Sequence, residues 1–411
     1  MFSGRPQHLF LKYGRILPLS VKDLYCLQFP YQTVIMKITS NFDSGNIEVV
    51  SINPLKKDIK LKIRKDTNSD FLQWFHFRLT GAMDTSCNFS ILNAGQSSYP
   101  GGWKDYRVCV SYDRHEWFRI PTTFRNGILS FQFKPQHNSV FFAYFVPYSY
   151  ERHLDLIHEA QLSDDVKMEI IGKTFLGRDI EMLLIGKPRR NKKVIWVVAR
   201  QHPGEPMAEW FIEGFLERLL DPNDSVSKMI LEKACFYVVP NINVDGSIAG
   251  NLRSSASGAN LNREWHKPSL KRSPEVYYVR KKMDETGVHL LLDVHGDEEL
   301  PYNFIAASEG IPDYNEYLAT MEKRFIEHWM DTCPDFQNTH KYPLDKFGEA
   351  NMTLCSNQIA HRFGCLSLTI EMPFKDNADM PDKRYGWSDW RSKLLGASVL
   401  NPVLYVLDDL Q

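Results

Sequence analysis

The sequence KVIWVVARQHPGEPMAEW, from Lys193 to Trp210, joins an apolar segment, a tight polar turn and a helical pattern. The apolar β-type segment is Val194–Val198, the turn is Arg200–Pro206, and the helical pattern begins at Met207. In an open α/β sheet, ligands bind just beyond the carboxyl ends of the strands, where this turn would lie. The stretch therefore predicts an α/β domain with a ligand site at its turn.

The turn carries His202 and Glu205, two side chains that can bind a metal. A neutral imidazole and a carboxylate three residues apart can converge on one cation, and this pair suits zinc. The same HxxE spacing recurs at His295 and Glu298. Because such a short pattern arises by chance in a chain with 13 histidines, neither pair identifies a metal site alone.

The composition is that of an ordinary soluble globular protein, with 43% hydrophobic and 24% charged residues. At 411 residues the chain is too long for a typical single core, so we expect two domains. A formal net charge of -1 gives no reason to expect a nucleic-acid or acidic-membrane partner. No run approaches the roughly 18 apolar residues of a membrane span. The oligomeric state stays open.

Cysteine usage indicates a reducing compartment. The seven cysteines are Cys26, Cys87, Cys109, Cys235, Cys333, Cys355 and Cys365. Their odd number, wide spacing and lack of a CxxC pair favour reduced thiols over a disulfide framework or a cysteine-bound metal. The N-terminus also lacks a continuous apolar signal core. We therefore expect a cytoplasmic protein.

The pattern divides the chain into three parts. Residues 1–35 form an irregular leader, and Met36, which begins the first well-patterned stretch, is a candidate start of translation. Residues 36–149 contain short alternating β runs separated by turn residues, which predicts an antiparallel β-sandwich domain. In residues 150–411 strands and helices alternate, which predicts a layered α/β domain.

The expected elements follow from these patterns. The β runs of the first domain are Asn46–Ile52, Ile59–Arg64, Phe71–Leu79, Cys87–Leu92, Tyr106–Tyr112, Ile128–Phe133 and Val140–Val146. The apolar strands of the second domain are Val194–Val198, Cys235–Val239, His289–Val294 and Leu366–Ile370. Its expected helices are Ala208–Leu220, Pro274–Lys282, Tyr314–Trp329 and Ser388–Leu407.

The expected strands of the α/β domain end in polar residues of catalytic type. His202 and Glu205 follow the first strand, His295 follows the third, and Glu371 follows the fourth. Because strand ends collect active sites in this architecture, we expect these side chains to lie close together. Two ligands from one turn and His295 from another strand would leave a fourth tetrahedral position for water, as in a catalytic zinc site.

Glu371 and Asp293 are candidates for supporting roles at this site. Glu371 emerges from the apolar segment Leu366–Ile370, and low-dielectric surroundings would raise the basicity that proton abstraction from water requires. Asp293 could accept a hydrogen bond from a ligand imidazole. The alternative for both residues is a solvated carboxylate at a strand end.

The loop from Gly250 to Trp265 is rich in Gly, Ser and Asn, and it carries Arg253, Asn262 and Arg263. Arginine presents a planar fork of donors that matches a carboxylate, and asparagine adds a directional donor. The loop is therefore either an anion-binding device or a solvated loop with two incidental arginines.

Six segments, taken together and in order, resemble the zinc metallocarboxypeptidases, and specifically the cytosolic carboxypeptidase subfamily. They are HPGEPMAEW (202–210), PNINVDG (240–246), GNLR (250–253), ANLNREW (259–265), DVHGDEELPYNF (293–304) and TIEMPF (369–374). The segment FFAYFVPYSY (141–150) and the β domain before it resemble that subfamily's N-terminal domain. The resemblance implies a three-layer α/β/α catalytic domain with a mixed sheet, one zinc ion per chain, and the C-terminus of a peptide or protein as substrate.

The resemblance also implies roles for the residues at the strand ends. His202, Glu205 and His295 would bind the zinc, which leaves Glu298 outside the metal shell. Glu371 would act as general base on the zinc-bound water and then as general acid.

For the substrate, the resemblance implies that Arg253 stabilises the developing oxyanion while Asn262 and Arg263 hold the terminal carboxylate. Pancreatic-type relatives also bring a mobile tyrosine over the substrate. Tyr342 is the nearest candidate in this chain, although it lies far upstream of Glu371.

The cytosolic subfamily removes glutamates from protein tails, and such a preference would need a basic residue in the pocket. Lys341, Lys346 and Arg362 are near in sequence, so the preferred C-terminal residue stays open. The expected function is hydrolysis of a C-terminal peptide bond. The two alternatives are a zinc amidohydrolase acting on N-acyl amino acids and a protein that binds peptide C-termini without turnover.

Overall fold

The computed structural model describes residues 35–411. Almost all of the expected leader, 1–35, therefore lies outside the described residues. Residues Met36–Gln411 form one unit. No helix within these residues is long and apolar enough to cross a membrane. The six cysteines in this part of the chain are all free and buried, in agreement with the expected reduced thiols.

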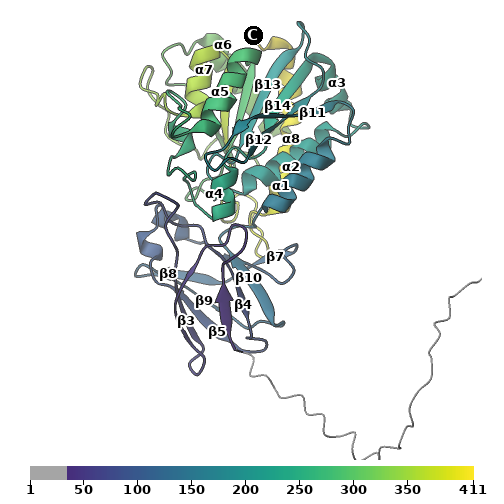
Figure 1. Cartoon of the computed structure of the whole chain (residues 1–411). Coiled ribbons are helices and arrows are strands. Elements are labelled where there is room, and N and C mark those ends of the chain that lie inside the picture. Colours follow the sequence, from purple (N-terminus) through teal and green to yellow (C-terminus); the bar gives the residue numbers. More distant parts are fainter. Residues whose placement is uncertain (1–34) are drawn as a thin grey trace, which may run out of the picture. The chain divides into compact units, whose positions relative to one another are not determined.

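A mixed seven-stranded sheet forms the centre of the second half of the chain (Figure 1). Its order is β11-β12-β14-β13-β15-β17-β16. The four neighbouring strands β14, β13, β15 and β17 run parallel. Every residue of β14, β15 and β17 is buried, as expected for parallel strands covered on both faces. The strands are β11 (Val166–Lys173), β12 (Asp179–Ile185), β13 (Lys193–Ala199), β14 (Ala234–Val239), β15 (Leu290–Val294), β16 (Phe304–Ala306) and β17 (Leu366–Glu371).

Helices cover both faces of this sheet and make a three-layer α/β/α arrangement (Figure 1). Along β13, Ile195 and Val197 belong to one buried cluster and Trp196 and Val198 to another, because successive side chains of a strand point to opposite faces. The first cluster is covered by α1 (Tyr150–Ala160), α2 (Met207–Leu219), α3 (Ser225–Lys233), α6 (Glu316–Thr332), α8 (Asp389–Ser398) and α9 (Leu400–Val406). The second is covered by α5 (Pro274–Thr286) and α7 (Cys355–Phe363).

The expected single helix Ser388–Leu407 is wrong, because the structure has two helices there, α8 and α9, which meet at Val399. Pro402 has no N–H to donate to the carbonyl of Ser398, and its ring crowds that carbonyl, so one continuous helix is disfavoured. The other three expected helices and the four expected apolar strands are confirmed to within a few residues.

The first half of the described chain contains two five-stranded sheets, with orders β1-β4-β10-β6-β7 and β2-β3-β5-β9-β8. Phe77 and Phe142 of the first sheet pack against Phe89 and Phe131 of the second, with ring centroids 5.0–6.2 Å apart, so the two sheets face one another as a sandwich. All pairs are antiparallel except β3 with β5, which is a departure from the expected purely antiparallel pattern.

The ten strands of these sheets are mostly short. They are β1 (Lys37–Thr39), β2 (Glu48–Asn53), β3 (Asp58–Lys62), β4 (His76–Thr80), β5 (Cys87–Ile91), β6 (Val108–Ser111), β7 (Trp117–Ile120), β8 (Thr122–Arg125), β9 (Ile128–Phe133) and β10 (Ser139–Ala143). The sequence pattern did not predict β1, β7 and β8, which have only three or four residues each and so show little alternation.

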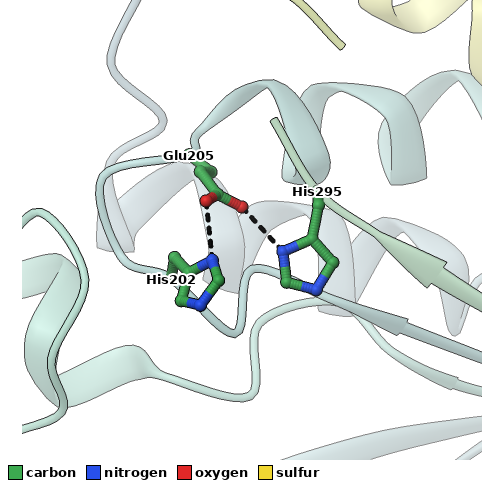
Figure 2. Close-up of side chains that lie close together, drawn as sticks. All are labelled: His202, Glu205 and His295. Atoms are coloured by element: carbon green, nitrogen blue, oxygen red, sulfur yellow. Dashed lines mark hydrogen bonds and ion pairs between the residues drawn. The ribbon is translucent and has the colours of Figure 1, made fainter. Parts of the chain in front are cut away.

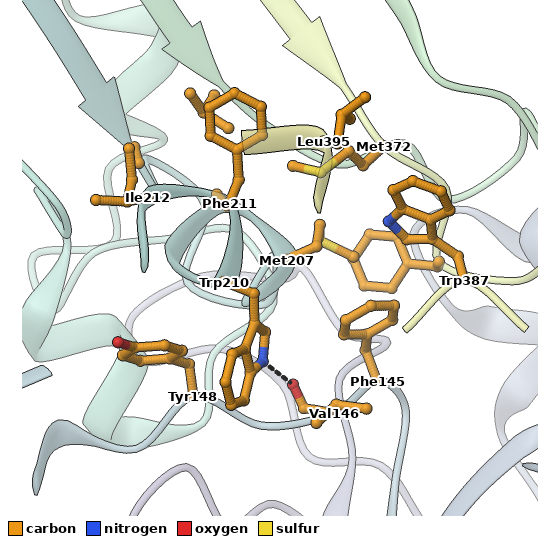
Figure 3. Packing of buried hydrophobic residues seen from close by; sticks show 14 of the residues in the cluster. Phe145, Val146, Tyr148, Met207, Trp210, Phe211, Ile212, Met372, Trp387 and Leu395 are labelled. Carbon is orange, nitrogen blue, oxygen red and sulfur yellow. Dashed lines mark hydrogen bonds between the residues drawn. The ribbon is translucent and has the colours of Figure 1, made fainter. Parts of the chain in front are cut away.

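Helix α2, which continues the opening stretch of sequence, is buried between the central sheet and the junction that follows β10 (Figure 3). The indole N–H of Trp210 donates to the carbonyl of Val146 at 3.1 Å, and its ring lies edge-on to Tyr148 with centroids 4.8 Å apart. Phe211 points to the opposite side, toward the sheet. Packing on both sides fixes the start of α2, and with it the turn that carries His202 and Glu205.

Candidate active site

A buried arginine, Arg200, holds the turn between β13 and α2 through its side-chain contacts. Arg200 adopts a left-handed backbone conformation, with φ of 58°, although it is not glycine. Its guanidinium donates to the carbonyl of Pro203 and to that of Tyr148, both at 3.0 Å, and forms an ion pair with Glu209 of α2. These contacts compensate for the unusual backbone conformation and fix the path of the turn.

His202, Glu205 and His295 lie together at the carboxyl ends of the neighbouring strands β13 and β15 (Figure 2). Nδ1 of His202 lies 2.6 Å from one carboxylate oxygen of Glu205, and Nδ1 of His295 lies 2.9 Å from the other. All three side chains are buried, with at most 3% of their surface exposed. One potential ligand atom from each lies within 4.8 Å of the others. The structure thus brings together the three residues expected to bind a metal.

The hydrogen bonds behind the two imidazoles leave their Nδ1 atoms free to bind a cation. Nε2 of His202 lies 3.1 Å from the side-chain oxygen of Asn260, and Nε2 of His295 lies 3.1 Å from a carboxylate oxygen of Asp293. Both oxygens can accept only, so they favour the proton on each Nε2, and a metal-binding imidazole would then present its Nδ1 lone pair. Such lone pairs and the Glu205 carboxylate would repel one another unless a cation lay between them. Two imidazole nitrogens and a carboxylate are a ligand set that suits zinc.

Asp293 is fully buried, so it is not the solvated carboxylate of the alternative interpretation. Gln201 donates to both of its carboxylate oxygens, at 2.8 and 2.9 Å, and Trp265 donates to the side-chain oxygen of Gln201 at 2.7 Å. The chain of contacts orients His295 through Asp293. The sequence offered no signal for Gln201, because its role depends on partners more than 60 residues away.

Glu371 is the last residue of β17, the strand next to β15, and its side chain is buried. Its Oε2 is among the buried atoms of the described residues that have no hydrogen-bond partner. Burial raises the pKa of Glu371 well above its ordinary value; His295 opposes this shift, and Glu205, Asp297 and Glu298 add to it. A dication held by the His-Glu-His group would lower that pKa again. The carboxylate is therefore desolvated, unpaired on one oxygen and close to the metal-binding group.

Arg253, Asn262 and Arg263 line a cavity of about 630 Å³, which His202, Glu205 and Glu371 also line. Asn262 and Arg263 lie in the short 3-10 helix Leu261–Arg263. The side-chain oxygen of Asn262 accepts from the amide of Cys355 at 2.8 Å, and Arg263 donates to the carbonyl of Asn262 at 2.7 Å. Six of the seven candidate residues therefore line one cavity, and the seventh, His295, contacts Glu205 at its wall.

Tyr342 also reaches this cavity, although it lies 29 residues before Glu371 in the sequence. Its hydroxyl lies 3.4 Å from Oε1 of Glu371 and donates to Asp297. Its ring packs edge-on against Phe304, which pairs with Glu371 across β16 and β17. The sequence separation was misleading because the loop between α6 and α7 returns to the strand ends.

Of the three basic residues near in sequence, Lys341 lines the cavity and Lys346 does not. Arg362 binds Asp284 at 2.6 Å instead. Glu298, from the second HxxE pair, lines the cavity but is not part of the metal-binding group. Tyr99, from the β-rich half of the chain, lines the cavity as well, and the sequence had indicated no functional residue there.

Two family models match this chain. Residues 38–145 match the cytosolic carboxypeptidase N-terminal domain, and residues 150–387 match the zinc carboxypeptidase family. An uncharacterized protein of Zymomonas mobilis is 47% identical over 375 residues, which cover 91% of this chain and 97% of that protein. Cytosolic carboxypeptidase 3 of Bos taurus is 28% identical, and the aligned part covers 72% of this chain but only 33% of the bovine protein.

Solved structures of metallo-carboxypeptidases are also similar to this chain. The metallo-carboxypeptidase of Burkholderia cenocepacia has a TM-score of 0.89 and 45% identity, covering 92% of this chain and all of that one. The metallo-carboxypeptidase of Pseudomonas aeruginosa, in complex with (2-guanidinoethylmercapto)succinic acid, also has a TM-score of 0.89 and 45% identity. The match covers 91% of this chain and 100% of that one.

Proposed function

Because this chain belongs to the zinc carboxypeptidase family and is a metallocarboxypeptidase, we propose that it removes the last residue of a peptide or protein by water attack at the His-Glu-His centre. The observation that carries this proposal is a cavity lined by His202, Glu205, Glu371 and the two arginines, with His295 grouped against His202 and Glu205. A metal site, a proton acceptor and anion-binding donors are the groups that hydrolysis of a C-terminal peptide bond needs.

When bound by the three side chains, zinc supplies Lewis acidity, which lowers the pKa of water to about 7 and polarises the scissile carbonyl. His202 and His295 would hold the zinc through their Nδ1 atoms, and Glu205 would hold it through its carboxylate. Asn260 and Asp293 keep both imidazoles in the tautomer that this requires.

Glu371 serves as the proton carrier. Its unpartnered Oε2 accepts a proton from the attacking water, and the same carboxyl then gives that proton to the leaving amine. Desolvation supports this role because it raises the basicity of the carboxylate. Both protonation states of Glu371 are used in each turnover, so the group returns to its starting state.

The two arginines of the Gly250–Trp265 loop bind two different negative charges of the substrate. Arg253 meets the charge that develops on the carbonyl oxygen, and loss of such a donor commonly costs about 3–4 kcal/mol of barrier. Arg263 and Asn262 hold the free terminal carboxylate. An internal residue has no such carboxylate to offer, which accounts for removal from the end of a chain.

C-terminal glutamate is one substrate to test, because the subfamily that the sequence resembles removes glutamates from protein tails. Lys341 lines the cavity and would pair with a glutamate side chain, whereas Glu309 lines it too and would repel one. The Pseudomonas structure is a complex with a guanidino-substituted succinic acid, which supports a carboxylate-bearing ligand for this chain. The names of the relatives also support a cytosolic location.

The test is a panel of peptides that differ only in the last residue, incubated with the zinc-loaded protein and followed by mass spectrometry. We expect release of the free C-terminal amino acid and a peptide shortened by one residue. The matched control is Glu371→Gln, which should bind zinc but release at least about 100-fold less product. Release of an acyl acid from N-acyl amino acids, with intact peptides, would instead indicate an amidohydrolase.

A further inference from the structure

Asp66 lies in the turn between β3 and β4, yet its carboxylate contacts the loop that carries Arg253. It accepts hydrogen bonds from three successive backbone amides, those of Leu252 at 2.6 Å and of Arg253 and Ser254 at 2.8 Å each. The side chain is 5% exposed. Three converging N–H groups form an anion-binding nest, and bonds from N–H groups to a charged acceptor are roughly twice as strong as neutral ones.

The turn that contains Asp66 also supports the Arg253 side chain. The amide of Asp66 donates to the carbonyl of Phe71 at 2.7 Å, which closes the turn. The guanidinium carbon of Arg253 lies 5.8 Å from the centre of the Phe71 ring and 5.3 Å from that of Tyr99. Both rings come from the β-rich half and offer their faces to the cation. This half of the chain therefore contacts both the backbone and the guanidinium of Arg253.

Gln73 fixes Tyr99 within the β-rich half, and Leu252 ties the Arg253 loop to the metal-binding turn. Gln73 brackets Tyr99 by accepting from its amide at 2.8 Å and donating to its carbonyl at 3.0 Å. The carbonyl of Leu252 accepts from the amide of Gly204 at 2.7 Å, between His202 and Glu205. A side chain at Gly204 would lie 2.7 Å from that carbonyl, so the approach requires glycine. The segment held by Asp66 is thus hydrogen-bonded directly to the turn that carries two of the residues expected to bind zinc.

We propose that Asp66 is a positioning residue for Arg253, and that through it the β-rich half of the chain takes part in catalysis. This inference rests on the proposed role of Arg253 at the developing oxyanion. A guanidinium stabilises that charge only from a fixed place, and a displacement of about 1 Å can cost about 100-fold in rate. The Asp66 nest sets that place by fixing the backbone on both sides of the Arg253 Cα atom.

A double-mutant cycle tests the proposal with Asp66→Asn, Arg253→Ala and the double variant. Asparagine has nearly the same shape, but it offers one oxygen to three donors and turns an NH₂ group toward the amides. We expect Asp66→Asn to lower kcat about 10- to 100-fold, with bound zinc and KM close to the parent. In the Arg253→Ala background the same substitution should cause no further loss, because both changes remove one function.

The matched control is Thr67→Val, which removes the neighbouring hydrogen bond from Thr67 to the side chain of Asn251 at 3.1 Å without touching Arg253. It should leave kcat within about twofold of the parent. Asp66→Ser replaces Asp66→Asn in the cycle if the asparagine variant does not fold.

Two results would overturn the proposal. If the losses from Asp66→Asn and Arg253→Ala multiply, Asp66 acts independently of Arg253. If Asp66→Asn lowers only the unfolding temperature and leaves kcat within twofold, its role is structural. Failure of the proposed function is distinguishable, because in that case the parent protein releases no C-terminal residue or Arg253→Ala leaves kcat unchanged.

Discussion

The hydroxyl of Tyr342 lies 3.4 Å from Oε1 of Glu371, the carboxylate proposed to carry the proton. The same hydroxyl donates to Asp297, whose other oxygen accepts from the amide of Glu299 at 2.8 Å. The phenol therefore lies between two carboxylates at the mouth of the cavity, on a side chain that is 40% exposed. A side chain in this position can bind the general base in the free enzyme and the substrate once it has entered.

Replacing Tyr342 by phenylalanine should lower kcat/KM about 5- to 10-fold, because one net hydrogen bond is worth about 1 kcal/mol. The ring would stay against Phe304. The measurement is steady-state kinetics on a good peptide substrate. Tyr302→Phe is the control, since Tyr302 stacks on His340 and does not line the cavity. Equal values for both variants would show that the Tyr342 hydroxyl has no part in turnover.

The two HxxE pairs can be distinguished by zinc content. Glu205→Gln should weaken zinc binding more than about 100-fold, since even residues that only orient ligands contribute 10- to 100-fold. Glu298→Gln should keep about one zinc per chain, because Glu298 is not part of the metal-binding group. Competition with a chelator and elemental analysis give both values. Similar zinc loss in the two variants would contradict the proposed ligand set.

Arg263→Ala should lower kcat/KM about 10- to 100-fold on peptides with a free C-terminus, the loss of one charge-assisted hydrogen bond of about 1.5–3 kcal/mol. On the same peptides with an amidated end, which react slowly in any case, the substitution should have little effect. Arg272→Ala is the control, because Arg272 is exposed and binds Glu264 at 3.0 Å. An equal loss on both kinds of peptide would argue against a carboxylate clamp.

His153 makes the stability of the protein depend on pH. Desolvation lowers its pKa, but Glu181 and Glu209 outweigh this and raise the pKa to about 9. Its Nδ1 lies 2.7 Å from Glu209 and its Nε2 lies 3.3 Å from Glu181. The folded-state pKa lies above the unfolded value, so the stabilisation is complete below about pH 6.5 and is lost as pH rises through about 9.

His153→Gln should therefore lower the free energy of unfolding by up to about 3 kcal/mol at pH 6, and by much less at pH 10. Urea unfolding at the two pH values gives the difference. His158→Gln, an exposed histidine of the same helix, serves as the control. A loss at His153 that does not change with pH would mean that packing, and not charge, accounts for it.

The sequence predicted the catalytic half well for a physical reason. Strands β13, β14, β15 and β17 are buried on both faces, so each is mostly apolar and can be recognised without its partners. Polar residues directly after such strands must lie at the same edge of a parallel sheet. His202, Glu205, His295 and Glu371 could be grouped on that basis, before any distance was known.

The antiparallel strands of the central sheet and the element boundaries were less predictable. Strands β11 and β12 have mixed burial, and β16 has only three residues, so none shows a clear pattern. The break at Val399 depends on Pro402, whose effect falls one turn earlier in the chain.

By itself, the sequence determined which residue types stand at the strand ends, because local burial and turn chemistry are written in neighbouring residues. Only the tertiary structure decided which distant groups complete the site. Asp66 meets the amide of Leu252 across 186 residues, and Tyr342 reaches Glu371 through a returning loop. Such contacts depend on how separately folded segments pack, and no local pattern in the chain records that packing.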